Sequence, residues 1–160
     1  MNGLYALAEK LVRLATERGV TLGTAESLTA GLIAATIADV PGASRVLVGG
    51  IVSYDPRIKR DLLGVPQEVI DGPGVVSEPC AKQMAVGARF ALKADVTASA
   101  TGVAGPSGGT PEAPVGTVYI GCATPRFTRV ERLQFTGDRG AVREQTVARA
   151  LTMMLESIEA

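Results

Sequence analysis

The sequence predicts an α/β protein, a three-layer α/β/α sandwich built on a mixed sheet. Segments with helical and strand periodicity alternate along most of the chain, and two adjacent strand-like segments follow before a last helix. The 160 residues are 46% hydrophobic but only 4% aromatic, which indicates the aliphatic, alanine-rich core of a layered protein. This length suits one domain and no repeat or linker interrupts it, so we expect residues 1–160 to form a single domain.

Five segments carry apolar residues at helical spacing, and several have clear start or stop signals. Gly19 ends the first, Ser77 is a typical cap for the fourth, and Asp138 precedes the last. A turn-rich stretch over 64–74 follows the third segment and has room for one more helical turn. The expected helices cover residues 4–18, 28–38, 56–63, 77–92 and 139–158.

Five further segments have the composition of strands. The glycines within the second segment indicate a bend or close packing. The last two segments flank Pro125 and are expected to form an antiparallel pair, which makes the sheet mixed. The expected strands cover residues 20–25, 45–54, 94–102, 116–125 and 127–137.

Charge and hydropathy narrow the range of partners and compartments. Lys and Arg together count 16 and so do Asp and Glu, which leaves no basic surface typical of nucleic-acid or membrane binding. No segment approaches the ~20 apolar residues of a membrane span, and the charged first helix does not resemble a signal peptide. We therefore expect a cytoplasmic protein without nucleic-acid or membrane partners, in which Cys80 and Cys122 are reduced thiols.

The chain contains no histidine. This absence excludes a Ser-His-Asp triad, a Cys-His dyad and a histidine-based zinc site within these residues. Any hydrolytic chemistry carried by this chain must therefore use another base.

Ser27 lies where an expected strand runs into an expected helix, in "TLGTAESLTAG" over 21–31. One interpretation is a helix cap, a role that serine favours and that stabilises a helix by about 1 kcal/mol. The other is a nucleophile, because amides at a strand-to-helix junction can stabilise an oxyanion. The amides of Leu28 and Thr29 would then be its nearest donors, and Glu26 would favour the start of the helix.

A serine nucleophile in this chain would need a lysine as its base, and Lys59 in "SYDPRIKRDLLGV" is the candidate. Its amine must be neutral to accept a proton, so either burial or a nearby cation must lower its pKa, and Arg57 and Arg60 are the neighbouring cations. Tyr54 would relay or orient the proton. The alternative is an ordinary surface lysine and an aromatic residue at a strand end.

Two further segments contain candidate binding residues. The glycine-rich "TGVAGPSGG" over 101–109 follows a strand, where it is either a ligand-binding loop or a mobile surface loop. In "TGDRGAVREQ", Arg139 and Arg143 lie four residues apart near the start of a helix, where cations oppose the helix dipole. Either an anionic ligand or pairing with a nearby carboxylate would offset that cost.

Together these segments resemble the CinA C-terminal domain family, in the form of standalone nicotinamide-nucleotide amidases. The resemblance covers nearly the whole chain, so residues 1–160 are expected to be one CinA C-terminal-like amidase domain. The segments that carry it are "TAESLTAGLIA", "DVPGAS", "GGIVSYDPRIKRDLLGV", "GVVSEPCAKQMAVGAR", "TGVAGPSGGTPEAPVGTVYI" and "FTGDRGAVREQTVARAL".

The resemblance implies hydrolysis of nicotinamide mononucleotide to nicotinic acid mononucleotide and ammonia, without cofactor or metal, in pyridine nucleotide recycling. It implies Ser27 as nucleophile, Lys59 as base and Tyr54 as assistant. Leu28 and Ala30 stand where many members carry cysteine and glycine. The resemblance and the apolar composition both favour a homodimer.

The phosphate of the substrate is expected to meet backbone amides and an arginine. The candidate residues are Thr29, Ala30, Gly31, Thr101, Gly102, Gly105, Arg139 and Arg143. The alternative to an enzyme is a nucleotide-binding regulatory module without catalysis, associated with competence or DNA damage. Binding of the mononucleotide without ammonia release would favour that alternative.

Overall fold

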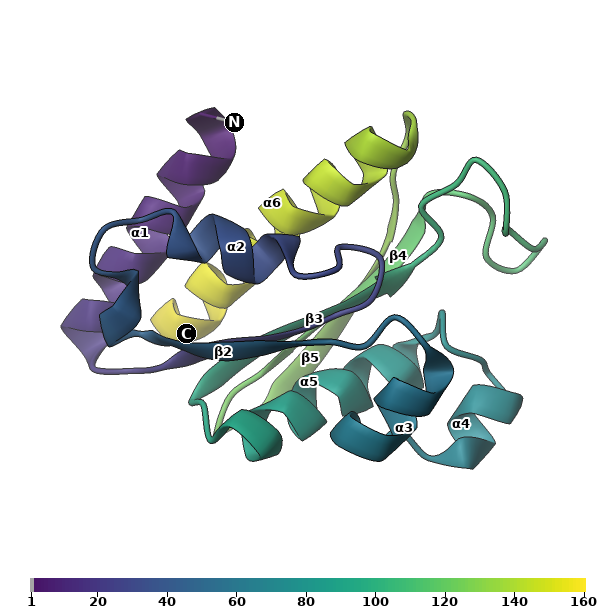
Figure 1. The fold of residues 1–160 in the computed structure, drawn as a ribbon, viewed down its shortest axis with the longest axis horizontal. Helices are drawn as coiled ribbons and strands as arrows, with labels where there is room; N and C mark the ends of the chain where they lie inside the picture. The colour runs from purple at the N-terminus through teal and green to yellow at the C-terminus, as the bar shows by residue number, and fades with distance from the viewer. Residues whose placement is uncertain (1) are drawn as a thin grey trace.

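A five-stranded sheet of order β2-β1-β3-β4-β5 forms the middle layer of the computed structural model, which describes residues 2–160 (Figure 1). β1 runs parallel to both β2 and β3, whereas β3, β4 and β5 alternate in direction. The mixed sheet expected from the sequence is therefore confirmed. The strands are β1 Leu22–Glu26, β2 Leu47–Val52, β3 Val96–Gly102, β4 Thr117–Ala123 and β5 Thr128–Gln134.

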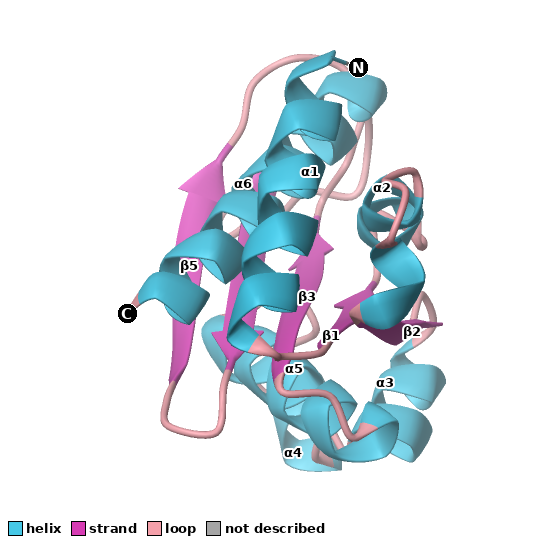
Figure 2. Cartoon of the chain, turned by 90° about the vertical axis from the view of Figure 1, so that its left-hand side faces the viewer, coloured by secondary structure: helices cyan, strands magenta, loops and turns pink. Residues whose placement is uncertain are grey.

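Helices cover both faces of the sheet and complete the α/β/α sandwich (Figure 2). One face carries α1, α2 and α6, and the other carries α3, α4 and α5. A short 3-10 turn, η1, follows α2. The helices are α1 Asn2–Arg18, α2 Leu32–Ala38, α3 Pro56–Leu63, α4 Gln67–Asp71, α5 Glu78–Leu92 and α6 Arg139–Glu159, and η1 is Ala43–Arg45.

Small residues let the layers approach closely, which is how a core with few aromatic side chains is filled. A Cβ added to Gly87 on α5 would overlap the carbonyl oxygen of Leu63 on α3. One added to Gly121 on β4 would lie 2.7 Å from the carbonyl oxygen of Ala81 on α5. The backbones are therefore in direct contact at both points, and the apolar core divides into one cluster on each face of the sheet.

Three of the expected helix starts are confirmed, those of α5 and α6 with the expected caps and that of α3 with a cap, Asp55, that was not predicted. The side chains of Asp55, Ser77 and Asp138 accept hydrogen bonds from backbone amides at the starts of α3, α5 and α6. The strand expected over 45–54 ends earlier, at Val52. It is shorter because the carbonyls of the next two residues accept hydrogen bonds from a lysine.

The helix expected over 28–38 is shorter than predicted, since α2 begins at Leu32. Its N-cap position is Gly31, which makes no side-chain cap. The carboxylate of Glu26, fully buried at the end of β1, accepts hydrogen bonds from the amides of Ile33 and Ala34 at 2.8 and 3.0 Å. The interpretation of Ser27 as a helix cap is therefore wrong, because Glu26 supplies the cap from inside the sheet.

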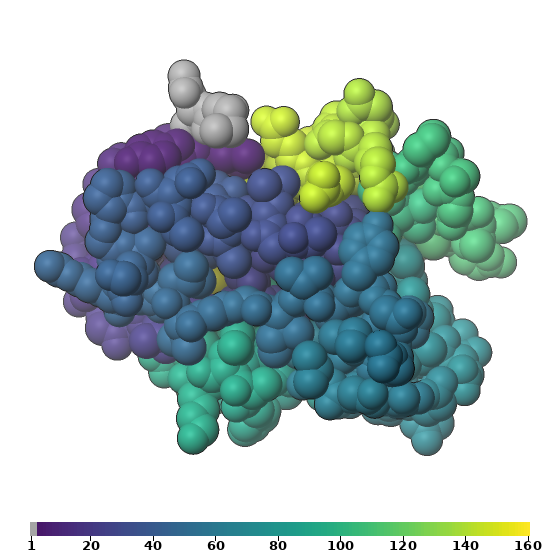
Figure 3. Space-filling model, in the orientation of Figure 1, coloured from purple at the N-terminus to yellow at the C-terminus, as the bar shows by residue number. Residues whose placement is uncertain are grey.

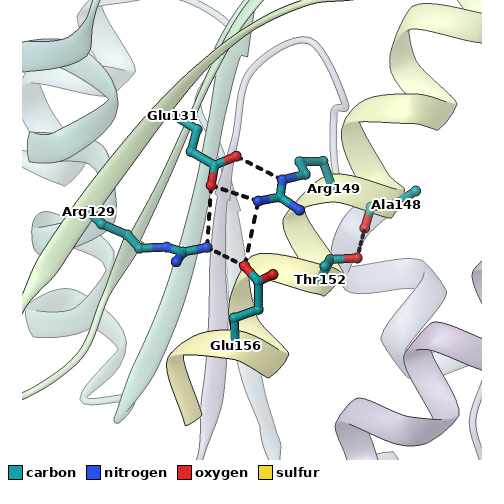
Figure 4. Close-up of polar contacts among 6 residues, drawn as sticks. All are labelled: Arg129, Glu131, Ala148, Arg149, Thr152 and Glu156. Carbon is teal, nitrogen blue, oxygen red and sulfur yellow. Dashed lines mark hydrogen bonds and ion pairs between the residues drawn. The ribbon is translucent and has the colours of Figure 1, made fainter. Parts of the chain in front are cut away.

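An ion-pair network joins β5 to α6 on the antiparallel side of the sheet (Figure 4). Arg149 donates two hydrogen bonds to the carboxylate of Glu131, and Arg129 contacts both Glu131 and Glu156. These contacts help to hold α6 against β5. The first turns of α6 lie at the other end of the sheet from this network. No helix within residues 2–160 is long and apolar enough to cross a membrane.

Candidate active site

The carboxyl ends of the parallel strands β1, β2 and β3 meet at one edge of the sheet, as the register of the three strands requires. Ser27 follows β1 at this edge and is 9% exposed. Its amide donates to the carbonyl of Ala100 on β3, and its own carbonyl accepts from the amide of Ala30. A ladder bond and a tight turn thus hold the serine where ligands usually bind in α/β sheets.

Lys59 reaches the same point from α3, the helix that follows β2. Its side chain is only 1% exposed. The Nζ atom lies 2.9 Å from the Oγ of Ser27, 2.6 Å from the carbonyl oxygen of Ser53 and 3.3 Å from that of Tyr54. The predicted pairing of Ser27 with Lys59 is therefore present in the structure, and a surface position for this lysine is excluded.

Burial lowers the pKa of the Lys59 amine below its ordinary value of 10.5, because desolvation penalises the charged form. Cys80 and Asp55 oppose this shift. Of the two causes that we expected, burial accounts for the shift, whereas repulsion from Arg57 and Arg60 is not among its causes. Arg60 instead pairs with Asp61 at 2.9 Å.

The three contacts of the Lys59 Nζ match the three donors of a charged ammonium, and they also accommodate a neutral amine. A neutral amine has two N–H donors and one lone pair. The carbonyls of Ser53 and Tyr54 can take the two donors, which leaves the lone pair facing the Oγ of Ser27. This arrangement allows the hydroxyl of Ser27 to donate its proton to Lys59.

The two cysteines are free and buried, and their thiols stay protonated. Burial raises the pKa of Cys80 and of Cys122 from 9.0 to about 11. Cys80 packs against Met84 near Lys59.

Tyr54 lies at the mouth of the site but does not contact the Ser27–Lys59 pair through its phenol. Its hydroxyl accepts a hydrogen bond from Arg139 at 2.9 Å, and Arg139 also donates to the carbonyl of Gly105 at 2.8 Å. Only the backbone carbonyl of Tyr54 meets Lys59. In the space-filling view the segment after β2 meets the start of α6 beside the 103–116 loop (Figure 3).

A cavity of about 270 Å³ opens over the Ser27–Lys59 pair. Four of the predicted substrate-binding residues line it, and Thr101 among them donates its hydroxyl to the carbonyl of Val75. Hollows of about 400, 480 and 510 Å³ lie elsewhere, but this pair lines none of them. The predicted site residues that line this cavity are Ser27, Tyr54, Lys59, Thr101, Gly102, Gly105 and Arg139.

The other predicted binding residues lie outside the lining of this cavity. Thr29, Ala30 and Gly31 form the back of the turn that carries Ser27. Arg143 donates from α6 to the carbonyl oxygens of Leu28 and Thr29, at 2.8 and 3.3 Å. These two carbonyls offset the unfavourable position of this cation near the helix start, a solution that the sequence did not reveal.

Glu26 is a site residue that sequence reasoning undervalued. Its carboxylate occupies the amides of Ile33 and Ala34 at the start of α2, and the expected oxyanion donors, the amides of Leu28 and Thr29, lie outside that cap. Leu28 lines the same cavity as Ser27, and its amide has no hydrogen-bond acceptor within residues 2–160. An acidic residue at the buried end of a strand, directly before a serine, was the available signal.

Fold and site together define an α/β protein with a buried serine–lysine pair at the carboxyl ends of parallel strands. The comparison with known families then identifies the group within that class. The chain belongs to the CinA C-terminal domain family, whose sequence profile matches residues 4–158.

Two curated relatives are similar over nearly all of this chain. A putative competence-damage inducible protein of Caldanaerobacter subterraneus is 45% identical over 153 residues, covering 96% of this chain and 37% of its own length. One of Symbiobacterium thermophilum is 47% identical and covers 92% of this chain and 37% of its own length. The chain thus spans little more than a third of these curated relatives.

Solved structures of the family have the same fold. The competence/damage inducible protein of Agrobacterium tumefaciens superimposes with a TM-score of 0.95 at 35% identity, covering 99% of this chain and 96% of that one. A CinA superfamily protein of Klebsiella pneumoniae gives 0.94 at 31% identity, with 98% of each chain covered. The α/β fold expected from the sequence is confirmed by both.

Proposed function

We propose that this chain is an amidase that hydrolyses the carboxamide of nicotinamide mononucleotide to the carboxylate and ammonia. The observation that carries the proposal is the buried Lys59 amine, 2.9 Å from the Oγ of Ser27. The motifs that resemble nicotinamide-nucleotide amidases supply the choice of substrate. A buried lysine with a lowered pKa beside a serine hydroxyl is the pairing that activates a serine without histidine.

Neutral Lys59 acts as the general base in the first half of the reaction. The Oγ of Ser27 forms a bond to the carboxamide carbon while its proton moves to the Nζ of Lys59. The amide of Leu28 stabilises the resulting oxyanion. The C–N bond then breaks as Lys59 returns the proton to the leaving nitrogen, and ammonia departs from an acyl-enzyme.

Water completes the reaction on the same two residues. It adds to the acyl carbon and gives a proton to Lys59. The bond between the acyl carbon and the Oγ of Ser27 then breaks, and the proton returns to that oxygen. The carboxylate product leaves with the nucleotide, and no external reagent beyond water is consumed.

The substrate fits the cavity with its carboxamide at Ser27 and its phosphate at the rim. The volume of about 270 Å³ is close to the lower end of ligand pockets, which is roughly 300 Å³. Arg139 at the rim supplies a positive charge for the phosphate. Tyr54, held by Arg139, forms a wall that orients the ring rather than a direct proton relay.

Ammonia release from nicotinamide mononucleotide, measured with EDTA present, tests the proposal. Wild type is expected to release ammonia and Ser27→Ala to release none, while Ser44→Ala, which alters a remote surface hydroxyl, behaves as wild type. Binding of the mononucleotide to wild type without ammonia release would reject the amidase and favour a regulatory binding module. Equal activity of wild type and Ser27→Ala would remove Ser27 from the mechanism.

A further inference from the structure

We infer that Arg143 is a positioning residue, which acts through the turn that carries Ser27 and does not bind the phosphate. The inference rests on the proposed function, because it concerns the reactivity of the same serine. Arg143 is half-buried, lies outside the cavity lining and donates to the carbonyls of Leu28 and Thr29. Its neighbour one helical turn earlier, Arg139, lines the cavity instead.

The direction of the amides in this turn follows from the direction of the carbonyls. In a trans peptide the C=O group and the following N–H point in opposite directions. The carbonyl of Ser27 accepts from the amide of Ala30 inside the turn, so the N–H of Leu28 points out of it. Arg143 donates to the carbonyl of Leu28 at 2.8 Å. This carbonyl and the N–H of Thr29 belong to one peptide group, so the contact fixes the direction of that N–H as well.

Two charged side chains therefore brace the nucleophile turn from opposite sides. The carboxylate of Glu26 connects the end of the turn that leaves β1 to the start of α2. The guanidinium of Arg143 ties its outer carbonyls to α6. Without Arg143, the segment from Leu28 to Gly31 would retain its internal turn but lose its link to α6.

This brace matters because acyl transfer requires the nucleophile and the oxyanion donor to keep a fixed mutual geometry. A misplacement of about 1 Å in such a site can cost on the order of 10²-fold in rate. A residue that holds the turn therefore affects the rate of attack on any acyl or phosphonyl group. A residue that holds the phosphate affects only ligands that carry one.

Labelling of Ser27 by an uncharged fluorophosphonate separates these roles, because the probe has no nucleotide phosphate to bind. Wild type is expected to be labelled, with the fluoride displaced by the Oγ of Ser27, and Ser27→Ala is expected not to be. Arg143→Gln is expected to be labelled about 10²-fold more slowly. Arg149→Gln, which alters a remote ion pair on the same helix, is expected to be labelled as fast as wild type.

Kinetics with nicotinamide mononucleotide give a second measure. Arg143→Gln is expected to lower kcat by about 10²-fold and to leave KM within about threefold of wild type. Thermal unfolding shows whether Arg143→Gln folds. If it does not, Arg143→Lys is the second variant, because it keeps the charge and can make only part of the contact with the two carbonyls. Its labelling rate is expected to lie below that of wild type and above the roughly 10²-fold loss expected for Arg143→Gln. An unchanged labelling rate with a raised KM would overturn the inference and make Arg143 a phosphate ligand.

The proposed function and this inference fail in different ways. Labelling of Ser27 that depends on Arg143, without ammonia release from the mononucleotide, would reject the substrate and retain the positioning role. A slower reaction accompanied by partial unfolding at the assay temperature would reject the positioning role as a general loss of stability. Failure of wild type to be labelled at all would reject both, since there would be no activated serine to position.

Discussion

The lowered pKa of Lys59 makes the stability of the protein depend on pH, and replacement of Lys59 by methionine should remove that dependence. The substitution keeps an unbranched side chain and deletes the Nζ atom that lies among the Oγ of Ser27 and two carbonyls. It also removes the proposed base. Lys59→Met is therefore expected to abolish ammonia release while the chain still folds.

The sign of the pH effect follows from the proton balance of this one amine. Between its lowered pKa in the folded protein and 10.5 in the unfolded chain, the unfolded chain binds more protons. The free energy of unfolding of wild type therefore rises with pH in this range, and the contribution is lost as the pH falls to the folded pKa. One proton corresponds to a slope of at most about 1.4 kcal/mol per pH unit.

Urea unfolding of wild type and Lys59→Met at a series of pH values measures this slope as a difference between the two proteins. The thiols of Cys80 and Cys122 contribute with the opposite sign. Because burial raises their pKa from 9.0 to about 11, their contribution to the free energy of unfolding falls as the pH rises through that range. Measurements below pH 9 avoid most of this contribution.

The expected result is a difference curve that rises toward alkaline pH, with the variant showing the flatter dependence. Parallel curves for the two proteins would mean that the amine has the same pKa in the folded and unfolded states. That outcome would refute a neutral Lys59 as the base at neutral pH. Lys59→Arg, which cannot become neutral, is the matched control and is expected to be inactive even if it folds.

Three further predictions concern the structure around the site. Glu26→Gln replaces one of the two carboxylate oxygens that accept amides at the start of α2 by an NH2 donor. It should lower the free energy of unfolding by about 2–3 kcal/mol and Tm by roughly 4–12 °C. An unchanged Tm would contradict the role of Glu26 as the cap. Ala30→Gly should stabilise the protein by up to about 1 kcal/mol in urea unfolding, because Ala30 has φ of 47°; a loss of stability would contradict this strain. Arg149→Gln breaks the partly exposed pair with Glu131 and should cost about 0.5–1 kcal/mol at low salt and less at high salt, whereas a salt-independent cost would argue against an ion pair.

The elements of the fold were predictable because their signals are local. Apolar spacing, proline and glycine positions and the caps at Asp55, Ser77 and Asp138 act within a few residues of the helices that they delimit. The α2 helix is the exception. Its cap comes from Glu26, whose carboxylate reaches amides seven and eight residues further along the chain, so propensity placed the helix start four residues too early.

The site was predictable in its residue types and only partly in their roles. The absence of histidine and the resemblance to amidases led to Ser27 and Lys59, and the structure brings these two together. Which arginine faces the cavity could not be predicted, because Arg139 and Arg143 have similar local sequence surroundings. Only the packing of α6 against the turn after β1 separates them.

By itself, then, the sequence determined the layered α/β class, most helix and strand positions and the choice of Ser27 and Lys59 as a candidate pair in a chain without histidine. Tertiary structure alone decided that Lys59 is buried with carbonyls as its partners, that Tyr54 bonds to Arg139, and that Glu26 caps α2. The physical reason is that burial and hydrogen bonding depend on segments that are distant in the chain. Their effects on pKa and orientation exist only once the sheet brings those segments together.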